Sequence, residues 1–124
     1  MAKILLVDDD QSLAQLTKIA LVKKGYEVMI ARDALKAIEV ATGQKPDLIL
    51  MDIMLPQVGG EEAVKKLKKN PNLKNIPVVF LTALVSPEED VEKAGITIDG
   101  LNYKTLGKPY EIDQLLKLVA SIVH

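Results

Sequence analysis

The 124-residue sequence is 48% hydrophobic and has a formal net charge of −1, from 16 basic and 17 acidic side chains. This suits a single domain, 1–124, with no output domain, and gives no basic surface for direct contact with nucleic acid or membrane. No cysteine is present and the one histidine is the last residue, which excludes thiolate chemistry and a histidine general base, and no apolar run suits a signal peptide or a membrane span, so we expect a cytoplasmic protein.

Short apolar runs alternate with segments of helical periodicity along the chain. The first run ends in three acids, Asp8, Asp9 and Asp10, and the helix after it ends at a Lys-Lys-Gly sequence. Asp33 is a suitable N-cap for the second helix. The predicted strands are 3–8, 26–31, 47–52, 76–82 and 103–107. The predicted helices are 11–24, 34–43, 60–70, 86–95 and 112–123.

The third predicted strand is the most informative stretch. An uninterrupted Leu-Ile-Leu-Met run leads directly into Asp52, and Pro56 and a glycine pair then break the pattern. Such a run is typical of a strand buried on both faces. Residues 96–102, by contrast, show only a weak pattern, and we interpret them as a loop.

Five strands that alternate with five helices predict a doubly wound α/β fold, in which helices cover both faces of a five-stranded parallel sheet. The carboxyl ends of parallel strands share one edge of the sheet. We therefore expect five side chains from distant parts of the sequence to meet there. They are Asp8, Asp9, Asp52, Thr82 and Lys108.

Three crowded carboxylates repel one another unless a cation compensates them, and oxygen ligands favour magnesium. A carboxylate can also attack phosphorus, and we predict that Asp52 is this nucleophile. Thr82 and Lys108 would then contact the remaining phosphoryl oxygens. Asp10 is more simply explained as the cap of the first helix.

The combination of these motifs resembles the response-regulator receiver domain of two-component signalling. The motifs are Val7-Asp8-Asp9, Met51-Asp52 with Pro56 and Gly60, Leu81-Thr82-Ala83 and Lys108-Pro109. The resemblance covers the whole chain and implies the flavodoxin-like strand order 2-1-3-4-5. It also implies a phosphorylation-dependent switch that catalyses only its own phosphorylation and dephosphorylation and changes its affinity for a partner.

The resemblance assigns a role to each site residue. Asp52 is the phosphoacceptor, Asp9 a direct magnesium ligand and Asp8 a ligand through water, while the backbone carbonyl of Met54 completes the metal site. Thr82 supplies the switch hydroxyl, and Lys108 contacts the phosphate. The donor is a phosphohistidine on a sensor histidine kinase or a histidine phosphotransfer protein, and the receiver is a monomer or a weak homodimer.

The sequence departs from the receiver pattern near its end. Receivers usually carry an aromatic residue three positions before the lysine, where this chain has Thr105, and Tyr103 lies five positions before Lys108. The segment from Gly95 to Lys108 is also several residues longer than usual. The lysines between 65 and 69 are interpreted as the solvent-facing side of the third helix.

Two alternatives remain open. The Asp8-Asp9-Asp10 sequence loosely fits the Asp-x-Asp element of haloacid-dehalogenase-type phosphatases, in which Asp8 would be the nucleophile and Asp10 the acid. The chain is short for that fold, and that interpretation leaves Asp52 and Lys108 without a role. The other alternative is a degenerate receiver that acts as a phosphorylation-independent interaction module.

Overall fold

The computed structural model describes residues 2–55, 57–82, 96–108 and 110–123, and it describes Thr82 by its backbone alone. Its strands are β1 (Lys3–Val7), β2 (Glu27–Ala31), β3 (Leu48–Asp52), β4 (Val78–Thr82), β5 (Ile96–Ile98), β6 (Leu101–Tyr103) and β7 (Thr105–Gly107). Its helices are α1 (Gln11–Lys23), α2 (Ala34–Gln44), α3 (Gly60–Lys69) and α5 (Ile112–Ile122). The helix predicted at 86–95 lies outside the described residues.

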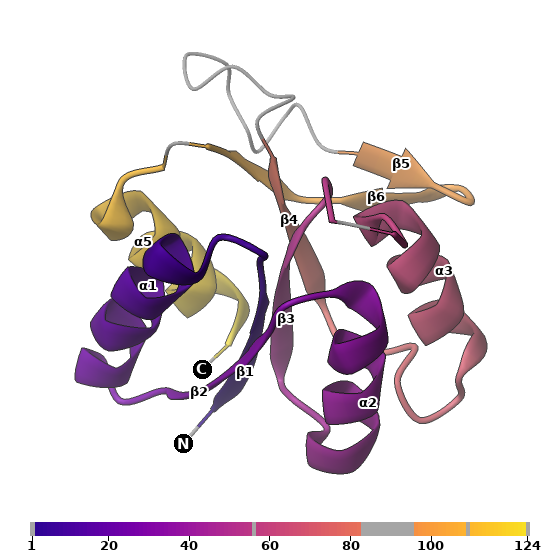
Figure 1. The fold of residues 1–124 in the computed structure, drawn as a ribbon, viewed down its shortest axis with the longest axis horizontal. Coiled ribbons are helices and arrows are strands. Elements are labelled where there is room, and N and C mark those ends of the chain that lie inside the picture. The colour runs from indigo at the N-terminus through magenta and orange to yellow at the C-terminus, as the bar shows by residue number, and fades with distance from the viewer. Residues whose placement is uncertain (1, 56, 83–95, 109, 124) are drawn as a thin grey trace.

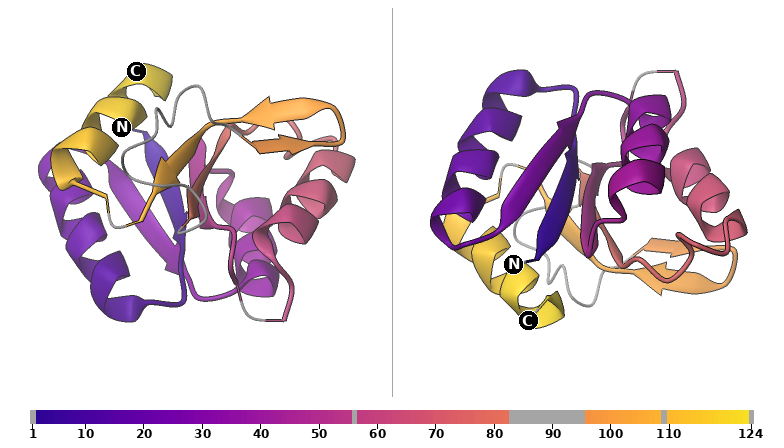
Figure 2. Two further views of the ribbon diagram at one scale, coloured as in Figure 1. Left: turned by 90° about the horizontal axis from the view of Figure 1, so that it is seen from above. Right: turned by 90° about the horizontal axis from the view of Figure 1, so that it is seen from below.

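Five strands form one parallel sheet in the order β2-β1-β3-β4-β7. The predicted doubly wound fold and its strand order are confirmed, with β7 in the place of the predicted fifth strand. Helices α1 and α5 cover one face of the sheet, and α2 and α3 cover the other (Figure 1). Figure 2 shows the same layers from above and below the view of Figure 1.

The alternation of side chains along each strand produces two separate cores. In β3, Leu48 and Leu50 pack with the residues of α1 and α5, whereas Ile49 and Met51 pack with those of α2 and α3. All five residues of β3 are buried, as its apolar run predicts. Asp52 therefore ends the strand that is enclosed between both helical layers.

The helix starts follow the sequence signals. The Asp10 carboxylate accepts a hydrogen bond from the Leu13 N–H at 3.1 Å and caps α1, as predicted. The Asp33 carboxylate accepts one from the Lys36 N–H at 2.8 Å and caps α2. No helix in the described part of the chain combines the length and the apolar character that a bilayer span requires.

The prediction of a loop at 96–102 is wrong. Strands β5 and β6 form an antiparallel hairpin in which Ile96 pairs with Tyr103, so that the last strand of the main sheet comprises only β7. The turn consists of Asp99 and Gly100, which have φ values of 50° and 82°. An Asp-Gly pair with positive φ at both positions is a favoured two-residue hairpin turn, and this dipeptide was the available sequence signal. The hairpin lies beside α3 in Figures 1 and 2.

Gly60 starts α3 at a point of very close backbone approach. A Cβ atom on residue 60 would lie 2.8 Å from the Asp52 carbonyl oxygen and 2.9 Å from the Ile53 Cα, and neither backbone atom can move away cheaply. The absence of a side chain at this position allows α3 to begin directly against the end of β3.

We predict that Gly60→Ala lowers the free energy of unfolding by about 1–3 kcal/mol, as overpacking of a close contact does. Urea denaturation measures this change. The matched control is Gly43→Ala in α2, where a Cβ would have no atom within 4 Å. The control should be neutral or stabilising by about 0.5–1 kcal/mol, because alanine is the better helix former. Equal effects of the two substitutions would contradict the steric argument.

Candidate functional site

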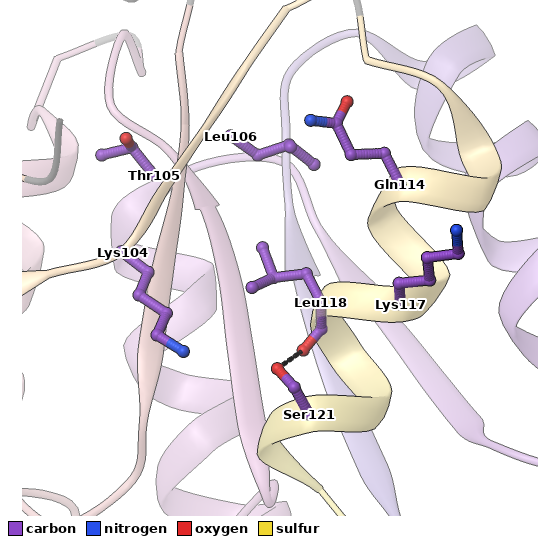
Figure 3. A pocket seen from close by; sticks show the side chains of 7 residues that line it. All are labelled: Lys104, Thr105, Leu106, Gln114, Lys117, Leu118 and Ser121. Carbon is purple, nitrogen blue, oxygen red and sulfur yellow. Dashed lines mark hydrogen bonds between the residues drawn. The ribbon is translucent and has the colours of Figure 1, made fainter. Parts of the chain in front are cut away.

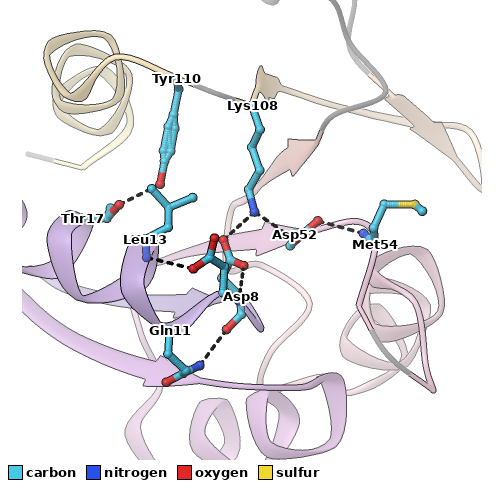
Figure 4. A network of polar contacts seen from close by, with 9 residues as sticks. Asp8, Gln11, Leu13, Thr17, Asp52, Met54, Lys108 and Tyr110 are labelled. Atoms are coloured by element: carbon cyan, nitrogen blue, oxygen red, sulfur yellow. Dashed lines mark hydrogen bonds and ion pairs between the residues drawn. The ribbon is translucent and has the colours of Figure 1, made fainter.

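Parallel pairing brings the predicted site residues to one edge of the sheet. Val7 of β1 is paired with Met51 of β3, so the residues that follow or end these strands, Asp8 and Asp52, lie at neighbouring strand ends. Gly107 ends β7, and the next residue, Lys108, extends back toward both acids (Figure 4). The predicted convergence of the two acids and the lysine is therefore observed.

Each of the two carboxylates is bonded in the same way. One oxygen accepts a hydrogen bond from the backbone N–H two residues further along the chain. The Asp10 N–H donates to Asp8 at 2.9 Å, and the Met54 N–H donates to Asp52 at 2.9 Å. The other oxygen accepts from the Lys108 Nζ atom, at 2.6 Å for Asp8 and 3.0 Å for Asp52. A single ammonium group thus bridges the two acids (Figure 4).

The bridge is largely removed from solvent. The side chains of Asp8, Asp52 and Lys108 are 1%, 9% and 17% exposed. Burial lowers the pKa of Lys108, but the hydrogen bonds to Asp8 and Asp52 and the charges of these acids more than compensate, and the net effect raises the pKa. Lys108 is therefore a permanent cation at neutral pH.

Asp9 joins the two buried acids from the exposed side of the site. Carboxylate oxygens of Asp8, Asp9 and Asp52 all lie within 4.8 Å of one another. The donor atoms in this group are all oxygens, which fits magnesium better than zinc or copper. Three carboxylates face one lysine, so the cluster keeps excess negative charge that a divalent cation would compensate.

The cluster reaches solvent at Asp9. This residue lines a hollow of about 370 Å³ together with Arg32, Asp33 and Lys36. Arg32 and Lys36 carry positive charges beside an acidic centre, which reduces the repulsion that an approaching anion would meet. The hollow thus has two basic and two acidic side chains in its wall, of which only Asp9 belongs to the cluster.

Two predicted site residues are only partly placed. Met54 contributes its N–H to Asp52, and its side chain is exposed; its carbonyl remains a predicted metal ligand. The backbone of Thr82 ends β4 and is paired with Gly107, between the strands that end in Asp52 and lead to Lys108. The hydroxyl of Thr82 lies outside the described part of the structure, so its switch role remains a prediction.

Two further contacts that the sequence did not predict support the site. The side-chain amide of Gln11 donates to the Asp8 carbonyl at 3.2 Å. The hydroxyls of Thr17 and Tyr110 are hydrogen-bonded at 2.7 Å and connect α1 to the segment that follows Lys108 (Figure 4). Neither contact has a sequence signal, because the partners depend on how α1 and the chain after β7 pack together.

The phosphatase alternative fits this geometry poorly. Asp10 would have to act as the acid, but its carboxylate caps α1. Asp8 would have to be the nucleophile, but its side chain is fully buried. Asp52 is the more accessible of the two buried acids.

A second hollow, of about 200 Å³, lies between β7 and α5 (Figure 3). Leu106 and Leu118 give it an apolar lining, and Lys104 and Lys117 stand at its sides. None of the described residues that line it is acidic, and none of them belongs to the acidic cluster.

The fold and the site together define a class: flavodoxin-like α/β proteins with an acidic cluster and a bridging lysine at the carboxyl edge of a parallel sheet. A family profile for the response regulator receiver domain matches residues 4–120. The chain belongs to this family. Receiver domains are phosphorylation-dependent signalling switches rather than classical enzymes, and they interact with histidine kinases or phosphotransfer proteins.

Individual relatives agree with this assignment. The chemotaxis response regulator CheY4 of Vibrio cholerae superimposes with a TM-score of 0.81 at 33% identity, over 99% of both chains. The polar-differentiation response regulator DivK of Brucella anthropi is 32% identical over 95% of this chain and 93% of its own length. The DNA-binding dual master transcriptional regulator RpaA of Synechocystis sp. is 33% identical over the whole chain. The chain spans about half the length of RpaA and of several other curated relatives.

We predict that Lys108→Met lowers the free energy of unfolding in metal-free buffer by about 1–3 kcal/mol, because two buried carboxylates lose their cation. Magnesium should restore more stability to this variant than it adds to the wild type, because the ammonium group no longer competes for the same oxygens. Urea denaturation with and without magnesium measures both effects.

The matched control is Lys104→Met, which removes an exposed lysine at the second hollow. It should change stability by less than about 0.5 kcal/mol and leave the magnesium effect unaltered. Equal stabilisation of Lys108→Met and the wild type by magnesium would contradict the competition between metal and lysine.

Proposed function

We propose that the chain accepts a phosphoryl group on Asp52 and uses it to change its affinity for a partner protein. The supporting observation is the position of the Asp52 carboxylate, which ends the buried strand β3 within 3.0 Å of the Lys108 ammonium and beside Asp8 and Asp9. A nucleophilic carboxylate flanked by a fixed cation and oxygen ligands for a metal has what phosphoryl transfer requires, namely positioning and charge compensation.

The chemical step is an exchange of one bond to phosphorus for another. A carboxylate oxygen of Asp52 forms the new P–O bond, and the P–N bond to a donor histidine breaks, with its electron pair remaining on the imidazole. The Lys108 ammonium, which now bonds the Asp52 carboxylate, is close enough to donate hydrogen bonds to the phosphoryl oxygens. Asp8, Asp9, Asp52 and the Met54 carbonyl would hold magnesium, which supplies positive charge against the transferring group.

The donor in this proposal is a phosphohistidine on a sensor kinase or a phosphotransfer protein. The family assignment supports this class of donor. The hollow at Asp9, in which Arg32 and Lys36 offset the charges of Asp9 and Asp33, is the side from which we propose that the anionic group approaches. The same site would release the phosphate by hydrolysis, so the only reactions of the chain are its own phosphorylation and dephosphorylation.

The switch in this proposal is a change in the hydrogen bonds that the Lys108 ammonium makes. In the unphosphorylated structure the ammonium divides its hydrogen bonds between Asp8 and Asp52. A phosphoryl group would add charge and acceptor oxygens on the Asp52 side, and Thr82 is the predicted hydroxyl donor to the same group. Two arrangements of these groups would then favour different surfaces, which is a population shift.

A receiver that works without phosphorylation is the less favoured alternative. Such a protein need not retain three clustered carboxylates and a buried lysine, because this arrangement is unfavourable in the absence of a function. The described site retains the cluster of Asp8, Asp9 and Asp52, with Lys108 bonded to Asp8 and Asp52.

We predict that acetyl phosphate and magnesium label the wild type with one phosphoryl group that hydroxylamine removes. Asp52→Asn should abolish the label, and chelation of magnesium should reduce it at least tenfold. Intact-protein mass spectrometry measures the label. Reduction of the acyl phosphate, or its reaction with hydroxylamine, followed by peptide mapping identifies the labelled aspartate.

The matched control is Asp10→Asn, which changes a neighbouring acid but keeps a side chain able to cap α1. This variant should be labelled like the wild type. A label on Asp8, or steady turnover of many phosphate esters, would overturn the proposal in favour of a phosphatase.

A further inference from the structure

The β5–β6 hairpin lies in the segment from Gly95 to Lys108, which departs from the usual sequence pattern of receiver domains. It has only two short strands, yet two of its side chains reach the core between the sheet, α2 and α3. Ile98 and Tyr103 are 6% and 7% exposed, whereas Asp99 at the turn is exposed to solvent. The hairpin therefore contacts the core both at its base, through Tyr103, and beside its turn, through Ile98.

Tyr103 is held between a ring and a cation. Its ring meets the Phe80 ring edge to face, with centroids 5.7 Å apart and an interplanar angle of 78°. The Lys68 ammonium lies 5.6 Å from the centroid of the Tyr103 ring, as in cation–π pairs. These contacts fix the hairpin to β4 and to α3.

Lys68 is half-buried, whereas the sequence pattern predicts that the lysines of this helix face solvent. Its ammonium donates to the Lys74 carbonyl at 2.7 Å and to the Ile76 carbonyl at 3.2 Å, so it is tied to the chain that enters β4. Burial lowers the pKa of Lys68. The lysine thus connects α3, the start of β4 and the hairpin.

Phe80 connects this anchor to the phosphoacceptor. The ring is fully buried in the middle of β4. A Cβ on Gly60 would lie 3.2 Å from the Phe80 Cε1 atom and 2.8 Å from the Asp52 carbonyl oxygen. The backbone at Asp52, the first residue of α3 and the Phe80 ring are consequently packed without a gap, and a displacement of one must move the others.

The chain itself supplies a second connection. Tyr103 ends β6, a single residue separates it from β7, and β7 leads directly to the lysine that bridges the two buried acids. A displacement of the backbone at Lys108 would therefore be transmitted along β7 to the base of the hairpin. Two independent physical links end at the same tyrosine.

We infer that the hairpin is the output element of the phosphorylation switch, an inference that rests on the proposed function of Asp52. A phosphoryl group on Asp52 displaces the first turn of α3 and, with it, the Phe80 ring, which then loosens its contact with Tyr103. In this inference the Phe80–Tyr103 ring contact is made in the unphosphorylated arrangement and weakened in the phosphorylated one, so that phosphorylation frees residues 96–103.

The test uses beryllofluoride with magnesium as a phosphoryl analogue on the intact chain. Fluorine NMR measures its binding, and hydrogen exchange measures the amides of 96–103. Exchange of the hairpin should become about fivefold faster or more when the analogue binds, the range typical of coupled sites. Tyr103→Leu should exchange rapidly without the analogue and should show no further increase.

Reciprocity gives a second expected result. Because loosening the hairpin favours the phosphorylated arrangement, Tyr103→Leu should bind beryllofluoride about fivefold more tightly than the wild type. Lys68→Met weakens the same anchor at a less buried position and should act in the same direction, which keeps the test decisive if Tyr103→Leu fails to fold. Tyr103→Phe keeps the ring and should behave like the wild type.

The matched control is Val79→Ala, next to Phe80 in β4 but packed in the core of the opposite face. It should lower stability and leave the response of the hairpin intact. Bound beryllofluoride with unchanged exchange of 96–103 would overturn the inference alone. Failure of beryllofluoride to bind would overturn the proposed function of Asp52 and the inference with it.

Discussion

Lys108 is the cation that allows two buried carboxylates to lie side by side at the carboxyl edge of the sheet. Each acid also accepts one backbone N–H, so the lysine completes two nearly identical hydrogen-bond patterns. The exposed third acid, Asp9, has no bond to Lys108, so the cluster keeps negative charge. This charge suits the cluster to a divalent cation, and the cation in turn can attract an anion. The carboxyl ends of β1, β3 and β7 place the groups that make up this charge balance.

The centre of the main sheet could be predicted from the sequence because β1, β3 and β4 are largely apolar runs of five residues with a polar residue at or directly after their carboxyl ends. Parallel pairing then dictates that Asp8, Asp52 and Lys108 meet, whatever their separation in the chain. Asp10 was also predictable, since capping depends only on local sequence. The roles of Met54 and Thr82 come from family resemblance, because no local pattern determines a carbonyl ligand or a switch hydroxyl.

The hairpin was missed because three-residue strands hardly register as periodicity, and only the Asp99-Gly100 turn marked them. The position of Lys68 was missed for a different reason. A lysine on a helix is expected to face water, and only tertiary packing brings the Tyr103 ring and the carbonyls of Lys74 and Ile76 within its reach. Sequence reasoning thus failed where short-range signals are weak and the partner is distant.

The separation of Lys108 from its partners also bears on how the chain folds. The lysine lies 100 residues after Asp8 and 56 residues after Asp52. Any partly folded state that has formed β1 and β3 but not β7 therefore holds the two acids together without their cation. Such a state is penalised by electrostatic repulsion, and the dissolved cations of the medium determine how large that penalty is. The ionic composition of the surroundings thus influences the order in which the strands assemble.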